Sequence, residues 1–140
     1  MLKSVSELRN LAHQGNRKTM AVVFAHNDHV IESVKLASDM DVIKPILIGD
    51  GEKIETLINA FGLKEPYEIV DEKDPQKASL YAMNLVNQGQ CDIVMKGLID
   101  TKIILREVVN SETGVRKSGL LSHVGVVSLP TYHKAIFATD

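Results

Sequence analysis

Residues 19–28 read TMAVVFAHND. The first seven form a nearly continuous apolar run, which is typical of a strand buried on both faces of a parallel sheet. Asn27 or Asp28 is placed to cap a helix, because either side chain can accept hydrogen bonds from its first free N–H groups. Ile31 and Val34 follow at helical spacing. The stretch therefore predicts a strand that leads directly into a helix.

The same alternation of apolar runs and amphipathic segments continues along the chain. Further strands are expected at residues 43–48, 67–70 and 92–95, and helices at residues 4–13, 52–61, 75–88 and 101–110. Two last apolar runs, at residues 121–129 and 134–138, are joined by a turn and predict an antiparallel pair. Strands that alternate with helices form parallel sheets covered on both faces. The expected fold is therefore α/β: three-layer and Rossmann-like, with a largely parallel sheet flanked by helices and a terminal antiparallel strand pair.

Composition and charge narrow the class of protein. A chain of 140 residues suits one domain, so residues 1–140 are expected to form a single α/β domain. The net charge of -2 argues against a broad nucleic-acid surface, which needs clustered Lys and Arg in excess. The single cysteine, Cys91, leaves no internal disulfide, and every apolar run is shorter than the roughly 20 residues of a membrane helix. We therefore expect a cytoplasmic protein that binds neither nucleic acid nor membrane.

The stretch that ends the fourth strand carries the main candidate site. Residues 95–101 read MKGLIDT, in which Gly97 lets the backbone turn closely and a helix begins near Thr101. Free N–H groups at a helix start attract anions at the carboxyl edge of a parallel sheet. Lys96 and Arg106 would add positive charge there, and arginine can hold phosphate through two parallel donors. The pattern indicates an anion site.

A plain turn is the competing interpretation of the same residues. Many strand-to-helix turns contain a Lys-Gly pair. On this interpretation Lys96 is solvated, and Arg106 forms a salt bridge with Glu107 or Glu112.

A second candidate stretch is the basic, glycine-containing loop at residues 114–119 and the segment after it. Ser118, Gly119 and Ser122 could line a cleft, and His123 could donate a hydrogen bond to an oxyanion. The competing interpretations are an exposed surface loop and, for His123, a core histidine satisfied by a backbone carbonyl.

Three other polar groups have simpler explanations. His26 and His29 lie three residues apart with Asp28 between them, but no Cys or further His cluster supplies a third metal ligand. We therefore expect no metal site and a helix-capping role for Asp28. Cys91 has no base nearby in sequence and is expected to be a small buried residue rather than a nucleophile.

Ordered stretches along nearly the whole chain resemble the phosphate acyltransferases of the phosphate butyryltransferase and phosphate acetyltransferase family. The later stretches are residues 95–101 with 105–109, residues 114–119 with 121–126, and the closing FATD at residues 137–140. Earlier, residues 25–28, 31–34 and 46–50 resemble the family's first strand-to-helix turn and second strand. The ordered set carries the resemblance, and it implies the N-terminal half of such an enzyme, the first of two domains.

The resemblance implies an enzyme that interconverts acyl-CoA and phosphate with acyl phosphate and coenzyme A. Phosphate must be held, and the tetrahedral oxyanion needs preorganised donors. By resemblance, the substrate-binding residues are Lys96, Gly97, Thr101, Ser118, Gly119 and Ser122, and the catalytic residues are Arg106 and His123. Coenzyme A is then a substrate, and no cofactor is tightly bound. Family members have two α/β domains with the active site in the cleft between them, and they form homo-oligomers.

Family members are about twice as long as this chain, within the usual size for two domains. The resemblance places most of the CoA-binding surface and the acid/base residue in the other half. We therefore expect the isolated chain to have little or no transferase activity. Three alternatives stay open: a phosphate-binding or acyl-phosphate-binding module without activity; a related enzyme, such as the phosphate acyltransferases of phospholipid synthesis or the isocitrate-dehydrogenase-like decarboxylating dehydrogenases; and a structural domain whose apolar face drives self-association.

Overall fold

The computed structural model describes residues 4–118 and 121–139, which form two compact units. The larger unit comprises residues 17–117, and the smaller comprises the described residues before and after that range. Gly119, one of the expected substrate-binding residues, lies outside the described residues, as does Asp140. The candidate anion-binding turn lies wholly within the larger unit.

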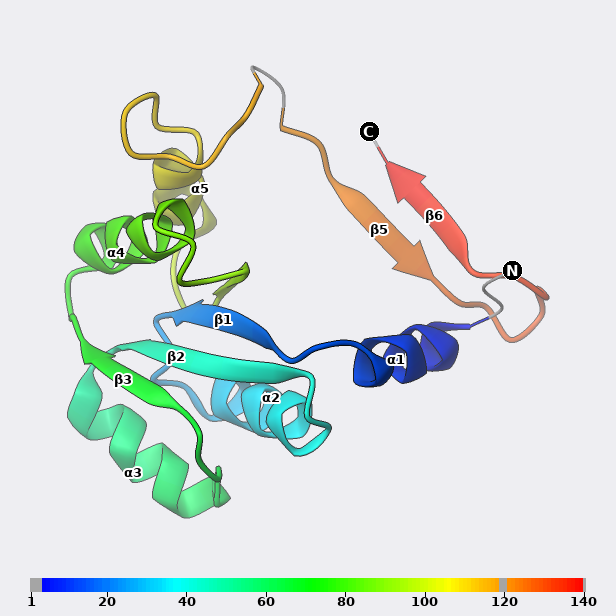
Figure 1. The fold of residues 1–140 in the computed structure, drawn as a ribbon, viewed down its shortest axis with the longest axis horizontal. Helices are drawn as coiled ribbons and strands as arrows, with labels where there is room; N and C mark the ends of the chain where they lie inside the picture. The colour runs from blue at the N-terminus through cyan, green and yellow to red at the C-terminus, as the bar shows by residue number, and fades with distance from the viewer. Residues whose placement is uncertain (1–3, 119–120, 140) are drawn as a thin grey trace. The chain divides into compact units, whose positions relative to one another are not determined.

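The larger unit is built on a parallel sheet of four strands (Figure 1). They are β1 (Lys18–Val23), β2 (Ile43–Gly49), β3 (Glu68–Asp71) and β4 (Ile93–Lys96), in the spatial order β3-β2-β1-β4. Each neighbouring pair runs parallel. The strands expected from the apolar runs are confirmed. Their ends differ by a few residues from the expected ones, because hydrogen bonding and not the apolar pattern defines where a strand ends.

Helices cover both faces of this sheet (Figure 1). α2 (Asp28–Asp39) and α3 (Gly51–Phe61) lie on one face, and α4 (Pro75–Asn87) and α5 (Thr101–Val108) lie on the other. Each of these helices follows one strand, so the chain alternates strand and helix as the sequence predicts. The three-layer arrangement of helices on a largely parallel sheet is confirmed.

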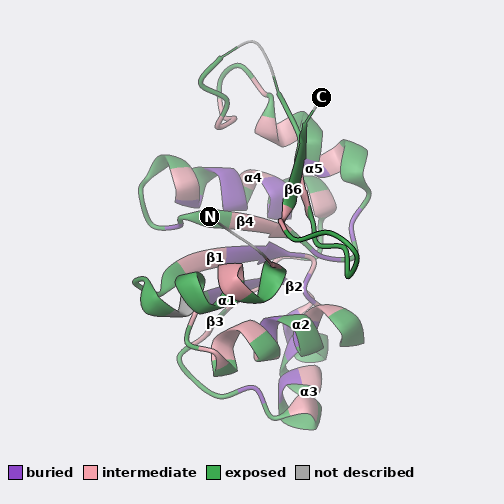
Figure 2. Ribbon diagram, turned by 90° about the vertical axis from the view of Figure 1, so that its right-hand side faces the viewer, coloured by how far each residue is buried: buried purple, intermediate pink, exposed green. Residues whose placement is uncertain are grey.

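The core has two layers because successive residues of a strand point to opposite faces of the sheet. On one face, Ala21 of β1 lies in an apolar cluster with Met83 of α4. On the other face, Val22 lies in a cluster with Ile31 of α2 and Ile54 of α3. All five side chains are fully buried, and Figure 2 shows buried residues along β1 and on α4. This two-sided burial holds the carboxyl ends of the strands in fixed positions.

The cap of α2 differs from the one that the sequence favoured. Oδ1 of Asn27 accepts hydrogen bonds from the backbone N–H groups of His29 and Val30, at 3.1 and 3.4 Å. Asp28 is the first residue of the helix and not its cap. Asn27 takes this role because it stands one residue before the helix, from where its side chain reaches the second and third N–H groups.

The smaller unit contains one helix and one pair of strands. They are α1 (Val5–Gln14), β5 (Val124–Val127) and β6 (Ile136–Thr139). β5 and β6 pair antiparallel, so the strand pair predicted for the end of the chain is confirmed. β5 is shorter than its apolar run, and β6 begins and ends slightly later than its run. In the part of the chain that the structure describes, no helix is both long and apolar enough to cross a membrane.

Candidate functional site

The candidate site lies at the carboxyl edge of the parallel sheet, where each strand gives way to a helix. The chain passes from β1 to β2 to β3 on one side and then places β4 on the other side of β1. Open α/β sheets bind ligands outside the carboxyl ends of the strands at such a switch point. Lys96 and Gly97 lie at the end of β4, and Thr101 begins α5. The fold therefore brings these three expected site residues to the switch point.

Gly97 lets the turn after β4 rest directly on the turn after β1. Its N–H donates to the carbonyl oxygen of Val23 at 2.8 Å, and the N–H of Leu98 donates to that of Phe24 at 3.1 Å. A Cβ at position 97 would lie 2.7 Å from the Val23 oxygen and closer still to the Phe24 oxygen. Real Cβ atoms do not approach backbone this closely, so the contact requires glycine.

The ammonium group of Lys96 folds over its own turn. Nζ donates to the carbonyl oxygen of Ile99 at 2.8 Å and to that of Gly97 at 3.3 Å. An ammonium group has three N–H donors, so one remains for a ligand. Lys96 thus stabilises the turn and also places positive charge at the start of α5.

Asp100 caps α5, and Thr101 is the first residue of the helix. Oδ1 of Asp100 accepts a hydrogen bond from the N–H of Lys102 at 2.8 Å. The carboxylate thereby takes one of the free N–H groups that an anion at this helix start would use. The N–H groups of Ile103 and Ile104 donate to the carbonyl oxygen of Asp100, at 3.0 and 3.4 Å. A phosphate at this place would therefore depend on Lys96 and on the N–H and hydroxyl groups of the exposed Thr101.

Arg106 lies beside a hollow whose lining includes none of the other expected site residues. It lies in the last turn of α5, and the hollow of about 140 Å³ at its side is lined by Gln76, Lys102, Ile103, Arg106 and Glu107. Five residues along a helix correspond to a rotation of about 140°, which turns Arg106 away from Thr101. Among the described residues Arg106 forms no ion pair, so the alternative pairing with Glu107 or Glu112 is absent there too. Its phosphate-neutralising role stays a prediction.

The remaining expected site residues belong to the smaller unit. Ser118, Ser122 and His123 are all exposed. His123 lies directly before β5, whereas the sequence placed it inside a strand. Because its side chain is exposed, His123 is not the buried core histidine of the competing interpretation. The part of these residues in the site stays a prediction.

His26 joins the turn after β1 to the turn after β2. Its Nδ1 accepts a hydrogen bond from the backbone N–H of Asp50 at 3.1 Å. A Cβ at Gly49 would clash with this same nitrogen, so the glycine allows the imidazole to approach. Sequence analysis considered His26 only as a metal ligand and missed this contact. The available signal was Gly49 itself, since a strand glycine often marks the close approach of another group.

Asp50 caps α3 between two ammonium groups. Its Oδ2 lies 3.5 Å from Nζ of Lys53, and its Oδ1 lies 3.6 Å from Nζ of Lys73. Burial by itself would raise the pKa of this carboxyl group. The hydrogen bond from the N–H of Lys53 and the two positive charges outweigh that effect, so the pKa of Asp50 lies below its ordinary value.

The imidazole of His26 is shifted in the direction that keeps it neutral. Burial lowers its pKa, the nearby charge of Lys53 lowers it further, and the charge of Asp50 opposes both to a smaller extent. The shift agrees with the geometry, because only a neutral imidazole has a lone pair on Nδ1 to accept the N–H of Asp50.

A hollow of about 390 Å³ lies beside His26. Its lining residues are His26, Asp28, Glu52, Lys53, Thr56 and Leu57, none of which was expected in the site. The second histidine of the considered metal pair, His29, is exposed, and its Nδ1 lies 4.0 Å from Glu32. Within the described ranges, no group of three or more His, Cys, Asp or Glu side chains is arranged to hold a metal ion.

Cys91 is a buried structural residue, as the sequence predicts, with 7% of its surface exposed. The N–H of Ala21 donates to its Sγ at 3.2 Å, and the thiol donates to the carbonyl oxygen of Ile93 at 2.9 Å. The sulfur therefore connects β1 to the beginning of β4, away from the carboxyl edge.

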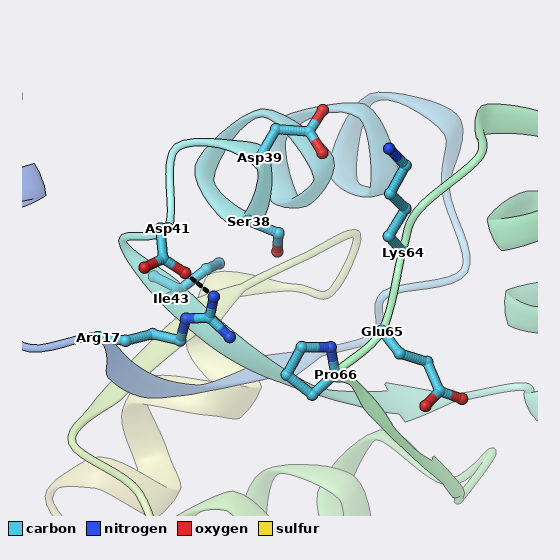
Figure 3. Close-up of a pocket in the computed structure, with 8 residues that line it drawn as sticks. All are labelled: Arg17, Ser38, Asp39, Asp41, Ile43, Lys64, Glu65 and Pro66. Carbon is cyan, nitrogen blue, oxygen red and sulfur yellow. Dashed lines mark ion pairs between the residues drawn. The ribbon is translucent and has the colours of Figure 1, made fainter.

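Another hollow, of about 290 Å³, lies at the opposite, amino-terminal edge of the sheet (Figure 3). It is lined by Arg17, Ser38, Asp39, Asp41, Ile43, Lys64, Glu65 and Pro66. Figure 3 shows Arg17 directed toward Asp41, with which it forms an ion pair. No expected site residue lines this hollow, so the carboxyl edge remains the candidate site.

Comparison with known proteins supports a specific relationship. The chain is 38% identical over 141 residues to a phosphate butyryltransferase from Clostridium beijerinckii and 36% identical over 141 residues to one from Clostridium acetobutylicum. It is 32% identical over 129 residues to a phosphate acetyltransferase from Thermotoga maritima. The first two alignments cover 100% of this chain and 47% of each relative; the third covers 91% and 43%. The chain thus spans about half the length of these relatives.

Solved structures agree with this relationship. A branched-chain phosphotransacylase from Enterococcus faecalis V583 superposes with a TM-score of 0.73 at 27% identity, covering 88% of this chain and 42% of that one. A phosphotransacetylase from Streptococcus pyogenes, at 13% identity, shares the fold with a TM-score of 0.68, covering 86% of this chain and 46% of that one. No family model matches the chain. The resemblance inferred from the motifs is confirmed: the chain is a homologue of the phosphate butyryltransferases and phosphate acetyltransferases over about half of their length.

Proposed function

We propose that this chain is the N-terminal half, the first of two domains, of a phosphate acyltransferase that interconverts acyl-CoA and phosphate with acyl phosphate and coenzyme A. The observation that carries the proposal is the 38% identity to a phosphate butyryltransferase along the whole chain, which includes the turn after β4. The position of that turn at the switch point of the sheet supports it. We also propose that the protein is cytoplasmic and forms a homo-oligomer.

The reaction explains why this turn needs a cation. A phosphate oxygen attacks the thioester carbonyl, a C–O bond forms, the C–S bond breaks, and the thiolate of coenzyme A leaves and takes up a proton. The attacking phosphate is an anion, so positive charge and N–H donors are needed to hold it in place. Lys96 offers one free ammonium N–H, and the first turn of α5 offers the backbone N–H of Thr101, because the N–H groups of the next three residues donate to Asp100.

The other expected residues complete the proposed site. Arg106 would neutralise charge on the phosphate. Ser118, Gly119, Ser122 and His123 would line the cleft, with His123 donating to the oxyanion. In keeping with the family resemblance, we place the acid that protonates the thiolate outside this chain.

A chimeric enzyme tests the proposed function. In the Clostridium beijerinckii phosphate butyryltransferase, the segment aligned with residues 1–140 would be replaced by this chain, and phosphate-dependent consumption of butyryl-CoA would be measured. We expect turnover by the chimera and little or none by the isolated chain. We expect Lys96→Met to lower kcat/KM of the chimera by roughly tenfold or more, since hydrogen bonds to charged groups contribute about 1.5–3 kcal/mol.

Lys64→Met is the matched control, because Lys64 is an exposed lysine at the opposite edge of the sheet. Its turnover should equal that of the unmodified chimera. A chimera that folds, as judged by circular dichroism, but shows no phosphate-dependent turnover would contradict the proposal. A binding module without activity is the second candidate. If the chimera is folded but inactive, and calorimetry still detects phosphate binding to it, the chain is such a binding module.

A further inference from the structure

We propose that His26 is a positioning residue for the anion-binding turn after β4, acting through the turn after β1. The inference rests on the proposed function in one respect: it takes the turn at Lys96 as the place where the phosphate binds. It concerns a residue that the sequence motifs did not single out for this role.

The first step is the contact between His26 and the neighbouring turn. Nδ1 of His26 accepts the N–H of Asp50, so the imidazole is neutral and carries its proton on Nε2. Gly49 lacks the Cβ that would clash with this nitrogen. The N–H of Ala25 also donates to the carbonyl oxygen of Ile48, at 3.0 Å. The turn after β1 is therefore hydrogen-bonded to the end of β2 and the turn after it through two successive residues, Ala25 and His26.

The second step connects His26 to the candidate site. The rings of His26 and Phe24 are in contact, with centroids 4.8 Å apart and planes inclined at 52°. Phe24 has a φ of 61°, which a non-glycine residue adopts only where its surroundings hold it. Its carbonyl oxygen accepts the N–H of Leu98, next to Gly97. The imidazole thus stabilises the backbone conformation on which the turn after β4 rests.

Protonation would break the first contact. An imidazolium carries protons on both nitrogens, so Nδ1 can no longer accept the N–H of Asp50. The charged groups beside His26 are Asp28 at the start of α2 and Asp50, Glu52 and Lys53 at the start of α3. From the end of β3, Asp71 accepts the N–H of Gly51 and Lys73 pairs with Asp50, so both act on this group of residues indirectly. Burial and Lys53 together keep the pKa of His26 below its ordinary value.

The sign of the effect is opposite to that of simple charge attraction. Lowering the pH from 7 to 5 adds positive charge to the protein, which by itself strengthens the binding of any anion. Loss of the hydrogen bond between His26 and Asp50 loosens the turn after β1 and with it the turn after β4, so anion binding at Lys96 becomes weaker. A decrease in affinity toward acid pH therefore identifies the positioning role.

The experiment measures sulfate affinity and backbone amide shifts of the 140-residue chain between pH 7 and pH 5. Sulfate is the probe because, unlike phosphate, it does not titrate in this range. We expect sulfate affinity to fall about fivefold as His26 is protonated, the change that corresponds to loss of one hydrogen bond. The amide signals of Asp50, Gly97 and Leu98 should titrate together, at a pH below the ordinary pKa of histidine.

Three variants make the test specific. His26→Gln supplies an acceptor oxygen that does not titrate, so its Gly97 and Leu98 signals should stay constant with pH and its sulfate affinity should not fall. His26→Phe removes the acceptor and should show the weakened state at every pH; should it fail to fold, His26→Gln decides. His29→Gln is the control, because His29 is exposed and lies three residues away, and it should titrate like the unmodified chain.

Two results would overturn the inference: amide signals of Gly97 and Leu98 that do not titrate with that of Asp50, or equal behaviour of His26→Gln and the unmodified chain. A chain that binds no sulfate at pH 7 counts against the phosphate site in the proposed function. In that case the amide titration alone still decides whether His26 positions the turn.

Discussion

Gly97 is the residue at which a single methyl group should have the largest local effect. A Cβ there would press on the carbonyl oxygens of Val23, the buried last residue of β1, and of Phe24, which follows it. We expect Gly97→Ala to lower the free energy of unfolding by about 1–3 kcal/mol, as overpacking does in well-packed cores, measured by urea denaturation. The variant should also displace the turn and weaken anion binding.

Gly15→Ala is the control for this substitution. Gly15 has a φ of -82°, and its Cβ would meet nothing closer than the carbonyl oxygen of Ala12 at 3.4 Å. Its free energy of unfolding should change by no more than about 0.5 kcal/mol. Equal stability of Gly97→Ala and the unmodified chain would show that the two turns are not in close contact.

Single residues also show where sequence-based prediction of the site reached its limit. Lys96 and Gly97 could be selected because a strand visibly ends there. The two hydrogen bonds of the Lys96 ammonium to its own turn could not be foreseen, since they depend on the path of the backbone. The position of Arg106 could have been questioned earlier, because the helical repeat already separates it from Thr101. His26 was missed because its partner Asp50 is 24 positions away.

Helices and strands were easier to predict than the site. Parallel strands buried on both faces read as apolar runs, and the starts of α4 and α5 are marked in the sequence by Asp74 and Asp100. Pro45 is tolerated in β2 because the pairing with β3 begins only at Ile46. The boundaries of β5 and β6 differ from the expected ones, since an apolar run does not show where pairing stops.

Asp74 provides the test at the scale of one element. Its Oδ1 accepts the N–H groups of Gln76 and Lys77, at 2.9 and 2.8 Å, and so starts α4. We expect Asp74→Ala to lower the free energy of unfolding by about 0.5–2 kcal/mol, by urea denaturation. Glu55→Ala, at an exposed position inside α3, should change it by no more than about 0.5 kcal/mol. If both variants were equally stable, the cap would not contribute to the start of α4.

The two edges of the four-stranded sheet differ in a way that matters for the whole molecule. β3 places the charged Glu68 and Asp71 at its ends, which discourages pairing with another strand. β4 carries Ile93, Val94 and Met95, and Ile93 is 40% exposed. An apolar edge strand is a template for association with further chain. The homo-oligomer expected from the resemblance would be one way to cover it.

Light scattering of the isolated chain tests this at the molecular scale. We expect its apparent mass to rise with concentration, and Ile93→Lys to reduce that rise because a charge on the edge opposes strand pairing. Glu68→Lys, at the other edge, should leave the association unchanged. A chain that stays monomeric at high concentration would rule out β4 as an association edge.

The place of β1 in the middle of the sheet has a consequence for how the protein is made. The hydrogen bond from Ala21 to Cys91 spans 70 positions, so β1 leaves the ribosome long before the strand that pairs with its second side. The nascent polypeptide carries a half-paired apolar strand from the emergence of β2 until that of β4. A polypeptide that ended before Ile93 would lack β4, so the edge of β1 that pairs with β4 would stay unpaired. We expect chaperones to bind such a product.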